Sequence, residues 1–117
     1  MILATCSYPR WTPEMGAPVR TSCGRPRFFT APLIEWPTTY PCSIYNLGLD
    51  EATFRRRYRH QLHKATPKLL RELEELVAAY DQPLVLLCYE PAGKFCHRTL
   101  LGEWITERTG LEVPELG

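Results

Sequence analysis

The pattern of hydrophobic positions is clearest in the last third of the chain. Residues 84–89 read LVLLCY, an apolar run without polar alternation that predicts a strand covered on both faces, as in a parallel α/β sheet. A loop with Pro91 and Gly93 ends this strand. Beyond the loop, apolar residues recur at helical spacing up to Gly110 and predict a helix that begins at 96–98: Leu100, Leu101, Trp104 and Ile105.

Two further helices are predicted before this strand. Asp50 stands in the position of an N-cap, and the residues that follow share one helical face because they are four apart: Phe54, Tyr58 and Leu62. Residues 66–67, Thr-Pro, restart a helix, with threonine as the capping residue and proline at the first position. This second helix ends near Asp81, and its buried stripe is Leu69, Leu70, Leu73, Leu76 and Val77.

The front of the chain predicts one strand and then a long excursion. Residues 2–7 are largely apolar and predict a first strand. Residues 8–49 hold seven of the eleven prolines and many aromatic residues, so this segment is too aromatic for a disordered linker. We expect it to be ordered, with a short strand at 19–23, and we expect a small edge strand at 111–113. Residues 1–117 are therefore predicted to form one small three-layer α/β domain with a short, mainly parallel sheet.

Composition and charge narrow the classes of partner. The net charge is only +1, so overall charge favours neither nucleic acid nor a membrane. Residues 1–68 carry +6 and residues 69–117 carry −5, which indicates either a basic face or a match between the two halves. No apolar run approaches the about 20 residues of a membrane span. Without a secretion signal and with five irregularly spaced cysteines, we expect a cytoplasmic protein with reduced thiols and no cofactor.

Two sets of motifs resemble a known family. The carboxyl-terminal set is CYE at 88–90, CHR at 96–98, a helix with a tryptophan, and TG at 109–110. The amino-terminal set is TCSYPRW and MGAPVRTSCGRPRF, and the chain closes on LEVPELG. Together they resemble DUF488, a bacterial domain of unknown function, in a branch found in actinobacteria and their phages. The resemblance implies a small α/β domain with parallel strands, but no established reaction.

The junction between the predicted strand and helix is the candidate site. Open α/β sheets bind ligands at such junctions, and the free N–H groups of a helix start favour an anion. Arg98, in the first helical turn, predicts an oppositely charged partner, either a ligand phosphate or Glu90. Cys96 is placed for a lowered thiol pKa and His97 for a base, so both are catalytic candidates, together with Glu90. The ligand-binding candidates are Arg98, Cys88, Arg20 and Arg27.

The sequence leaves two classes of function open. The first is the binding of a phosphate-bearing, nucleotide-like ligand at this junction, with or without catalysis. The second is a non-catalytic interaction module for nucleic acid or a host protein, in which residues 96–98 are a structural clasp. Nucleic-acid phosphates would meet the basic residues of the helix after Asp50: Arg55, Arg56, Arg59, His63 and Lys64. A solvated face paired with acidic residues of the next helix explains the same pattern.

Zinc is the remaining alternative at this junction. Four possible zinc ligands would converge if the strands run parallel: Cys6, Cys88, Cys96 and His97. The reason is that Cys6 and Cys88 both stand at the ends of predicted apolar strands. No pair among them has the close C-x2-C or H-x3-H spacing of structural zinc sites, so we expect no metal. Cys23 stands where we expect an aliphatic residue in DUF488 relatives, and it is not counted as a site residue.

Overall fold

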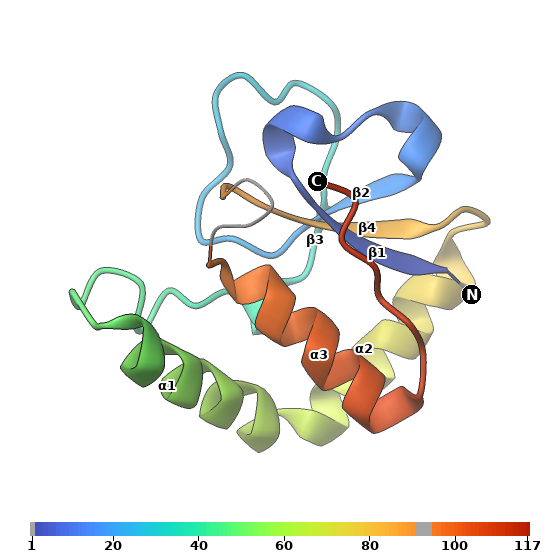
Figure 1. Cartoon of the computed structure of the whole chain (residues 1–117). Helices are drawn as coiled ribbons and strands as arrows, with labels where there is room; N and C mark the ends of the chain where they lie inside the picture. The colour runs from blue at the N-terminus through green and yellow to red at the C-terminus, as the bar shows by residue number, and fades with distance from the viewer. Residues whose placement is uncertain (1, 91–94) are drawn as a thin grey trace.

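The computed structural model of the chain describes residues 2–90 and 95–117, and its centre is a four-stranded parallel sheet (Figure 1). The expected loop residues Pro91 and Gly93 lie outside the described residues. The strand order is β1-β4-β2-β3, with bounds Leu3–Ser7 for β1, Ala17–Arg20 for β2, Ile34–Glu35 for β3 and Leu84–Cys88 for β4. Because all neighbouring strands are parallel, their carboxyl ends lie at one edge of the sheet.

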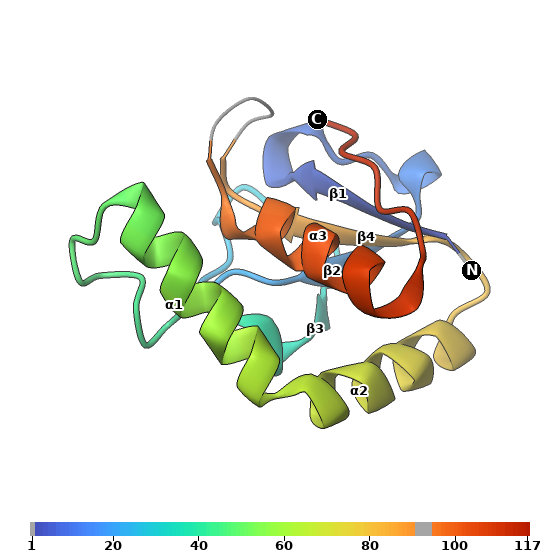
Figure 2. The same ribbon diagram turned by 60° about the horizontal axis from the view of Figure 1, so that its bottom comes forward.

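Three helices lie on one side of this sheet: α1 (Glu51–Lys64), α2 (Thr66–Ala79) and α3 (His97–Thr109) (Figure 2). Helix α3 packs directly on β1 and β4, and α1 packs on α3. The core between helices and sheet includes Leu62, Leu69, Leu86, Leu101 and Ile105, which are fully buried. None of the described helices is long and apolar enough to cross a membrane.

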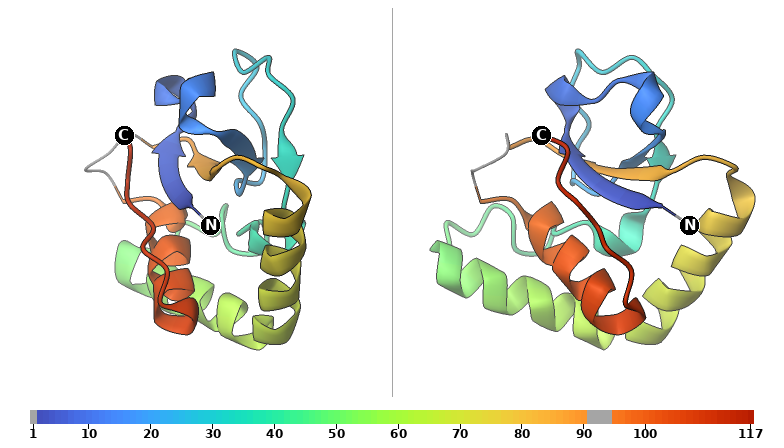
Figure 3. Two further views of the ribbon diagram at one scale, coloured as in Figure 1. Left: turned by 90° about the vertical axis from the view of Figure 1, so that its right-hand side faces the viewer. Right: turned by 45° about the vertical axis from the view of Figure 1, so that its right-hand side comes forward.

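The other face of the sheet is covered by the amino-terminal excursion (Figure 3). Alternate residues of β4 belong to the two cores, Leu84 and Leu86 to the helical side, Val85 and Leu87 to the other side. On that other side the rings of Tyr8 and Phe29 meet edge to face, with their centroids 5.3 Å apart. The apolar run of β4 therefore has cover on both faces, as the sequence predicts, and the domain has a helical layer, a sheet and an irregular aromatic layer.

The helix boundaries follow the sequence closely. The Asp50 carboxylate accepts a 2.9 Å hydrogen bond from the Thr53 N–H, which confirms the predicted N-cap of α1. Gly110 ends α3 with a φ of +78°, in the left-handed region that favours glycine. Tyr58 and Leu62 of the predicted apolar face are buried, and Phe54 is half-buried.

Three local predictions need correction. The short strand expected at 19–23 lies at Ala17–Arg20, because its register is set by pairing with β4. Thr66 is not an N-cap; its hydroxyl donates back to the carbonyls of Leu62 and His63, so it joins the two helices instead. Residues 111–113 form no strand; the tail pairs with β1 only later, through a bridge between Thr5 and Glu115.

The expectation of reduced thiols throughout also differs from the structure. Cys23 is paired with Cys42 and Cys88 with Cys96 in disulfides, and Cys6 is free and buried. The pairs are 19 and 8 residues apart in sequence. Cys23–Cys42 joins two irregular segments that only the fold brings together, and Cys88–Cys96 joins the end of β4 to the N-cap of α3. Neither spacing by itself indicates a disulfide.

Candidate functional site

The described residues of the predicted junction meet at the carboxyl edge of the sheet. Cys88 is the last residue of β4, Cys96 is the N-cap of α3 and His97 is the first residue of that helix. All three side chains are buried, with exposed fractions of 3 to 4%. The parallel strand and the returning helix therefore bring two sulfur atoms and an imidazole together, and these atoms lie within 4.8 Å of one another.

The hydrogen bonds of His97 fix the state of its ring. Its Nε2 lies 2.7 Å from the Thr21 carbonyl oxygen, so Nε2 carries the proton and donates it. The other nitrogen, Nδ1, then carries no proton, and this atom lies 3.4 Å from the Cys88 sulfur and 3.9 Å from the Cys96 sulfur, neither of which has a proton to donate in the disulfide. Burial lowers the pKa of His97 to about 4, aided by the Arg98 charge and opposed by the Thr21 bond. The imidazole is therefore neutral at pH 7.

A cavity of about 370 Å³ opens above these three residues, and we call it the thiol pocket. Four aromatic side chains and one carboxylate contribute to its wall. The full lining is Ser22, Cys23, Gly24, Tyr45, Phe54, Cys88, Tyr89, Glu90, Phe95, Cys96 and His97. This volume falls in the range of about 300–1,000 Å³ typical of small-molecule sites, and its mixed apolar and polar wall is also typical.

Arg98 lies beside the thiol pocket but does not line it. Its exposed fraction is 1%, and its Nε and Nη2 each donate a 3.0 Å hydrogen bond to the Glu115 carboxylate. Its Nη1 donates to the main-chain carbonyl of Glu90. The carboxylate opposite Arg98 is thus that of Glu115 in the tail, and Glu90 contributes its main-chain carbonyl rather than its side chain. The internal ion pair that the sequence left as an alternative therefore forms with a different partner, Glu115 in place of Glu90, and we call the Arg98–Glu115 pair the clasp.

Glu115 is the other half of this clasp. Burial by itself raises the pKa of its carboxyl, but hydrogen bonds from Arg98 and Thr5 outweigh burial, and the pKa lies below its ordinary value. The Thr5 hydroxyl donates to the same carboxylate at 2.7 Å. The clasp therefore connects the start of α3, the loop after β4 and strand β1 through one ion pair.

The two other arginines expected at the ligand are placed differently. Arg20, at the end of β2, bonds Glu35 at 2.6 Å and the main-chain carbonyls of Ser22 and Cys23. It therefore holds the segment that forms one wall of the thiol pocket. Arg27 is exposed and is not among the residues that line that pocket.

Sequence reasoning missed several residues of the thiol pocket. Cys23, which is not counted as a site residue from the sequence, lines the pocket. Ser22, which lines the pocket, and Thr21, whose carbonyl bonds His97, follow the end of β2 at the same edge at which Cys88 ends β4. Parallel pairing is the signal that would have found them. Tyr45 lies in the irregular segment before α1 and Phe54 lies in α1, and neither carries a sequence signal for a position at this pocket.

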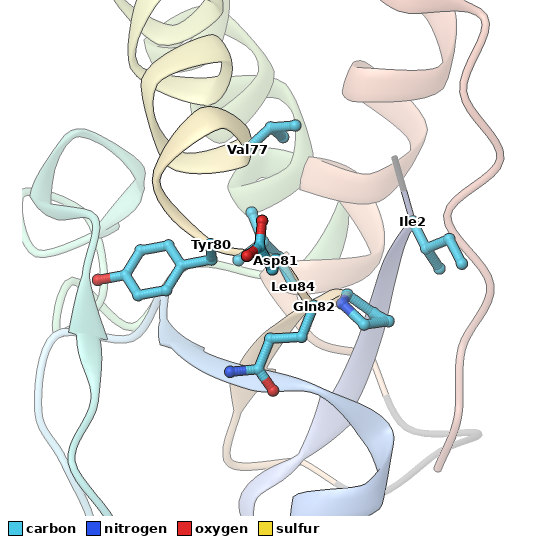
Figure 4. Close-up of a pocket in the computed structure, with 7 residues that line it drawn as sticks. Ile2, Val77, Tyr80, Asp81, Gln82 and Leu84 are labelled. Atoms are coloured by element: carbon cyan, nitrogen blue, oxygen red, sulfur yellow. The ribbon is translucent and has the colours of Figure 1, made fainter.

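Within the part of the chain that the structure describes, two other hollows are lined by no cysteine. One, of about 280 Å³, lies at the amino ends of β1 and β4, where Figure 4 shows Tyr80, Asp81 and Gln82 beside Leu84. Asp81 is the only charged side chain among the described residues that line it. The second hollow, about 640 Å³, lies beside α1 and is lined by the basic residues Arg56, Arg57, His60 and Lys64 with Ser43, Ile44 and Gln61.

The residues expected to bind nucleic acid divide into two groups. Arg55 pairs with Glu51 and Arg59 with Glu107, while His63 contacts Arg108 on α3. The expected acidic partners on the next helix do not take part in these ion pairs; Glu72 accepts hydrogen bonds from Trp36 and Thr38 instead. Arg56 and Lys64 remain at the surface and line the hollow beside α1.

Fold and site together define a small parallel α/β domain with a buried cysteine–histidine cluster where a central strand meets a helix. The sequence model of DUF488-N3a, described as the active DUF488-N3 subclade, matches residues 46–109. This match spans 64 of the 117 residues and contains both helices α1 and α2, strand β4 and the whole of α3. The chain belongs to this family. No curated protein and no solved structure matches the chain.

Proposed function

We propose that this protein binds a phosphate-bearing, nucleotide-like small molecule in the thiol pocket. The observation that carries the proposal is the position of this pocket, which lies above the amino end of α3 and at the carboxyl edge of a parallel sheet. Open α/β sheets bind their ligands at this edge. The proposal does not require Arg98, because α3 itself offers the electrostatic attraction.

The start of α3 favours a phosphate. Cys96 is the N-cap, but its side chain makes no capping hydrogen bond to the helix. The first-turn N–H groups of a helix have no partner within the helix, and the helix dipole adds partial positive charge there. An anion in the thiol pocket would accept hydrogen bonds from these groups.

The aromatic wall of the pocket favours a flat ring in the same ligand. Tyr45, Phe54, Tyr89 and Phe95 all contribute to the lining. Tyr89 and Tyr45 keep exposed fractions of 37% and 53%, so their rings are accessible. A base stacked on such a ring gains about 1–3 kcal/mol. A phosphate at α3 and a base on this wall describe a nucleotide-like ligand.

The buried cluster supplies reactive groups beneath this ligand. Cys88 or Cys96 would be the nucleophile when reduced, the neutral His97 would accept a proton at Nδ1, and Glu90 would contact the ligand from the rim. Arg98 would act as a positioning residue for the start of α3. The description of the family as an active subclade supports a catalytic role.

A binding screen with a matched pair of variants tests the proposal. Inorganic phosphate, nucleoside monophosphates and nucleoside triphosphates are titrated against wild type, Tyr89→Ala and Tyr80→Ala, with binding followed by calorimetry and thermal shift. Tyr80 is as exposed as Tyr89, at 39%, but lies at the opposite end of β4. We expect Tyr89→Ala to weaken nucleotide binding by about 1–3 kcal/mol, with Tyr80→Ala equal to wild type. Equal binding by all three proteins, or no binding by wild type, contradicts the proposal.

The basic side of α1 supports a second candidate, contact with nucleic acid. Within the described residues no ion pair involves Arg56, Arg57 or Lys64. With His60 they surround one hollow, and we call these four residues the α1 basic face. Unpaired basic side chains gathered on one helix are suited to phosphate contacts along a strand of nucleic acid.

A further inference from the structure

We propose that Cys88, Cys96 and His97 form a zinc site when the Cys88–Cys96 disulfide is reduced. Two thiolate sulfurs and one imidazole nitrogen would be the protein ligands, and the fourth position would face the thiol pocket. The inference does not depend on the nucleotide-like ligand proposed above, because the metal would bind to the protein alone.

The positions of the three donor atoms fit a tetrahedral cation. Zinc lies about 2.3 Å from cysteine sulfur and about 2.0–2.1 Å from histidine nitrogen, which places neighbouring sulfur and nitrogen ligands about 3.5–3.6 Å apart. The His97 Nδ1 lies 3.4 Å from the Cys88 sulfur and 3.9 Å from the Cys96 sulfur. Only the two sulfurs, now bonded to each other, must separate.

The backbone leaves room for that separation. The Cα atoms of Cys88 and Cys96 lie 7.1 Å apart, beyond the range of about 4.4–6.8 Å usual for a disulfide. Cys88 is fixed by its strand and Cys96 by the start of α3. A rotation of each side chain, without a change of fold, would bring the sulfurs to the spacing that a shared cation requires.

His97 is oriented as zinc-bound histidines are. Its Nε2–H donates to the Thr21 carbonyl oxygen at 2.7 Å, so the lone pair of Nδ1 points away from Thr21 and toward the two sulfurs. Metal-bound histidines almost always donate their other ring N–H to a carbonyl or carboxylate, which fixes the tautomer. Thr21 would be this outer partner, and it is itself fully buried.

Charge balance permits a metal at this depth. A zinc ion with two thiolates and a neutral imidazole has no net charge, so its burial avoids the cost of an isolated ion. A dithiol reductant would first transfer two electrons and two protons to the disulfide and be oxidised to a disulfide itself. Zinc would then displace both thiol protons to the solvent. The oxidised pair has no thiolate to offer, so the oxidation state of the pair decides whether the metal binds.

The fourth position distinguishes this site from a closed structural one. Three protein ligands and an open position are typical of catalytic zinc, whereas structural zinc is usually held by four side chains. The open side of the cluster is the thiol pocket, where water or a ligand group has access. Cys6 contributes nothing here, because it lies in the opposite core with its sulfur 3.9 Å from that of Met15.

Cobalt(II) titration of the full chain tests the proposal. Reduction also opens the Cys23–Cys42 disulfide, so the experiment uses Cys23→Ser/Cys42→Ser as the background. We expect the reduced protein to bind one Co²⁺ per chain, with thiolate charge-transfer absorption and the strong visible bands of a tetrahedral site, and Zn²⁺ to displace it. The same protein with the Cys88–Cys96 pair oxidised should bind none. This comparison requires no substitution of the three proposed metal ligands, although Cys23 itself lines the thiol pocket.

Three variants assign the ligands. Cys88→Ser and His97→Gln should weaken Co²⁺ binding at least about tenfold, since loss of even an outer partner costs about 10–100-fold. Cys6→Ser is the matched control and should bind as the background does. Failure of the reduced protein to bind Co²⁺ while its circular dichroism is native, or binding that survives oxidation or Cys88→Ser, overturns the proposal. Nucleotide binding by the oxidised protein would be unaffected by any of these results.

Discussion

At the scale of single residues, Arg98 shows how the junction is held. A guanidinium in the first turn of a helix faces the positive end of the helix dipole, which is unfavourable unless a carboxylate compensates. Glu115 supplies that carboxylate in a two-bond arrangement, with the Glu90 carbonyl as third acceptor. Because Arg98 is 1% exposed, loss of its partner would leave a buried charge with only part of its hydrogen bonding.

Glu115→Gln should therefore destabilise the fold, and Glu112→Gln, an exposed neighbour, should not. We expect Glu115→Gln to lower the free energy of unfolding by about 2–3 kcal/mol at pH 7. This is less than the about 3–5 kcal/mol for breaking a fully buried ion pair, because the Glu115 side chain is 32% exposed. The pKa of Glu115 is lowered in the folded protein from 4.5. Its contribution is therefore complete above pH 4.5 and is lost as the pH falls through the lowered value. Urea unfolding at pH 7 and at pH 3 measures the free energy of unfolding of both variants. An equal loss of stability at the two pH values, or an equal loss in Glu115→Gln and Glu112→Gln, would contradict the clasp.

At the scale of elements, Gly16 sets how β2 enters the sheet. Its φ is +134°, and a Cβ there would lie 2.3 Å from the main-chain oxygen of Pro83, just before β4. Ala17 donates its N–H to that same oxygen, so the close approach is part of the strand pairing. Any side chain at residue 16 would have to displace the backbone of Pro83, which leads into β4.

Gly16→Ala should consequently cost more stability than Gly48→Ala. Gly48 also has a positive φ, +67°, but a Cβ there would have no atom within 4 Å. The left-handed conformation alone accounts for about 1–2 kcal/mol in Gly48→Ala, whereas Gly16→Ala adds a backbone clash. Thermal unfolding of the two variants compares them, and equal melting temperatures would show that β2 and β4 do not approach as described.

At the scale of the whole molecule, part of the excess positive charge of residues 1–68 is concentrated on one surface. Residues 1–68 carry +6, but Arg20, Arg55 and Arg59 are paired with acidic residues. Among the other basic residues of this half, Arg56, Arg57 and Lys64 gather with His60 around one hollow, the α1 basic face. If nucleic acid is a partner, its affinity for the protein should fall steeply as the salt concentration rises. The double variant Arg56→Ala/Arg57→Ala should weaken binding, and the slope of log K against log salt concentration should become smaller by about 1 for each lost phosphate contact. Fluorescence anisotropy with a labelled oligonucleotide measures both quantities.

The matched control for that experiment is Lys68→Ala/Arg71→Ala, which removes the same charge from exposed residues of α2. It should leave binding close to wild type. An equal loss in both double variants would mean that only net charge matters, and no binding by wild type would exclude this second function.

The sequence by itself determined the three helices, the strands β1 and β4, and the junction at which the candidate site residues meet. Local signals suffice for these: the apolar run of β4, the Asp50 N-cap, the helical spacing of α1 to α3 and the terminal Gly110 depend on neighbouring residues only. The order of a strand followed by a helix also placed Cys88, Cys96 and His97 at one edge of a parallel sheet.

Tertiary structure alone decided which partners these residues have. Arg98 meets Glu115 from the tail, His97 meets Thr21 after β2, and Cys23 meets Cys42 across the excursion. Each contact joins segments that are distant in sequence or lack a regular period, so no local pattern encodes it. The physical reason is that side-chain pairing depends on strand order and on the path of the irregular layer, both of which follow from packing over the whole chain.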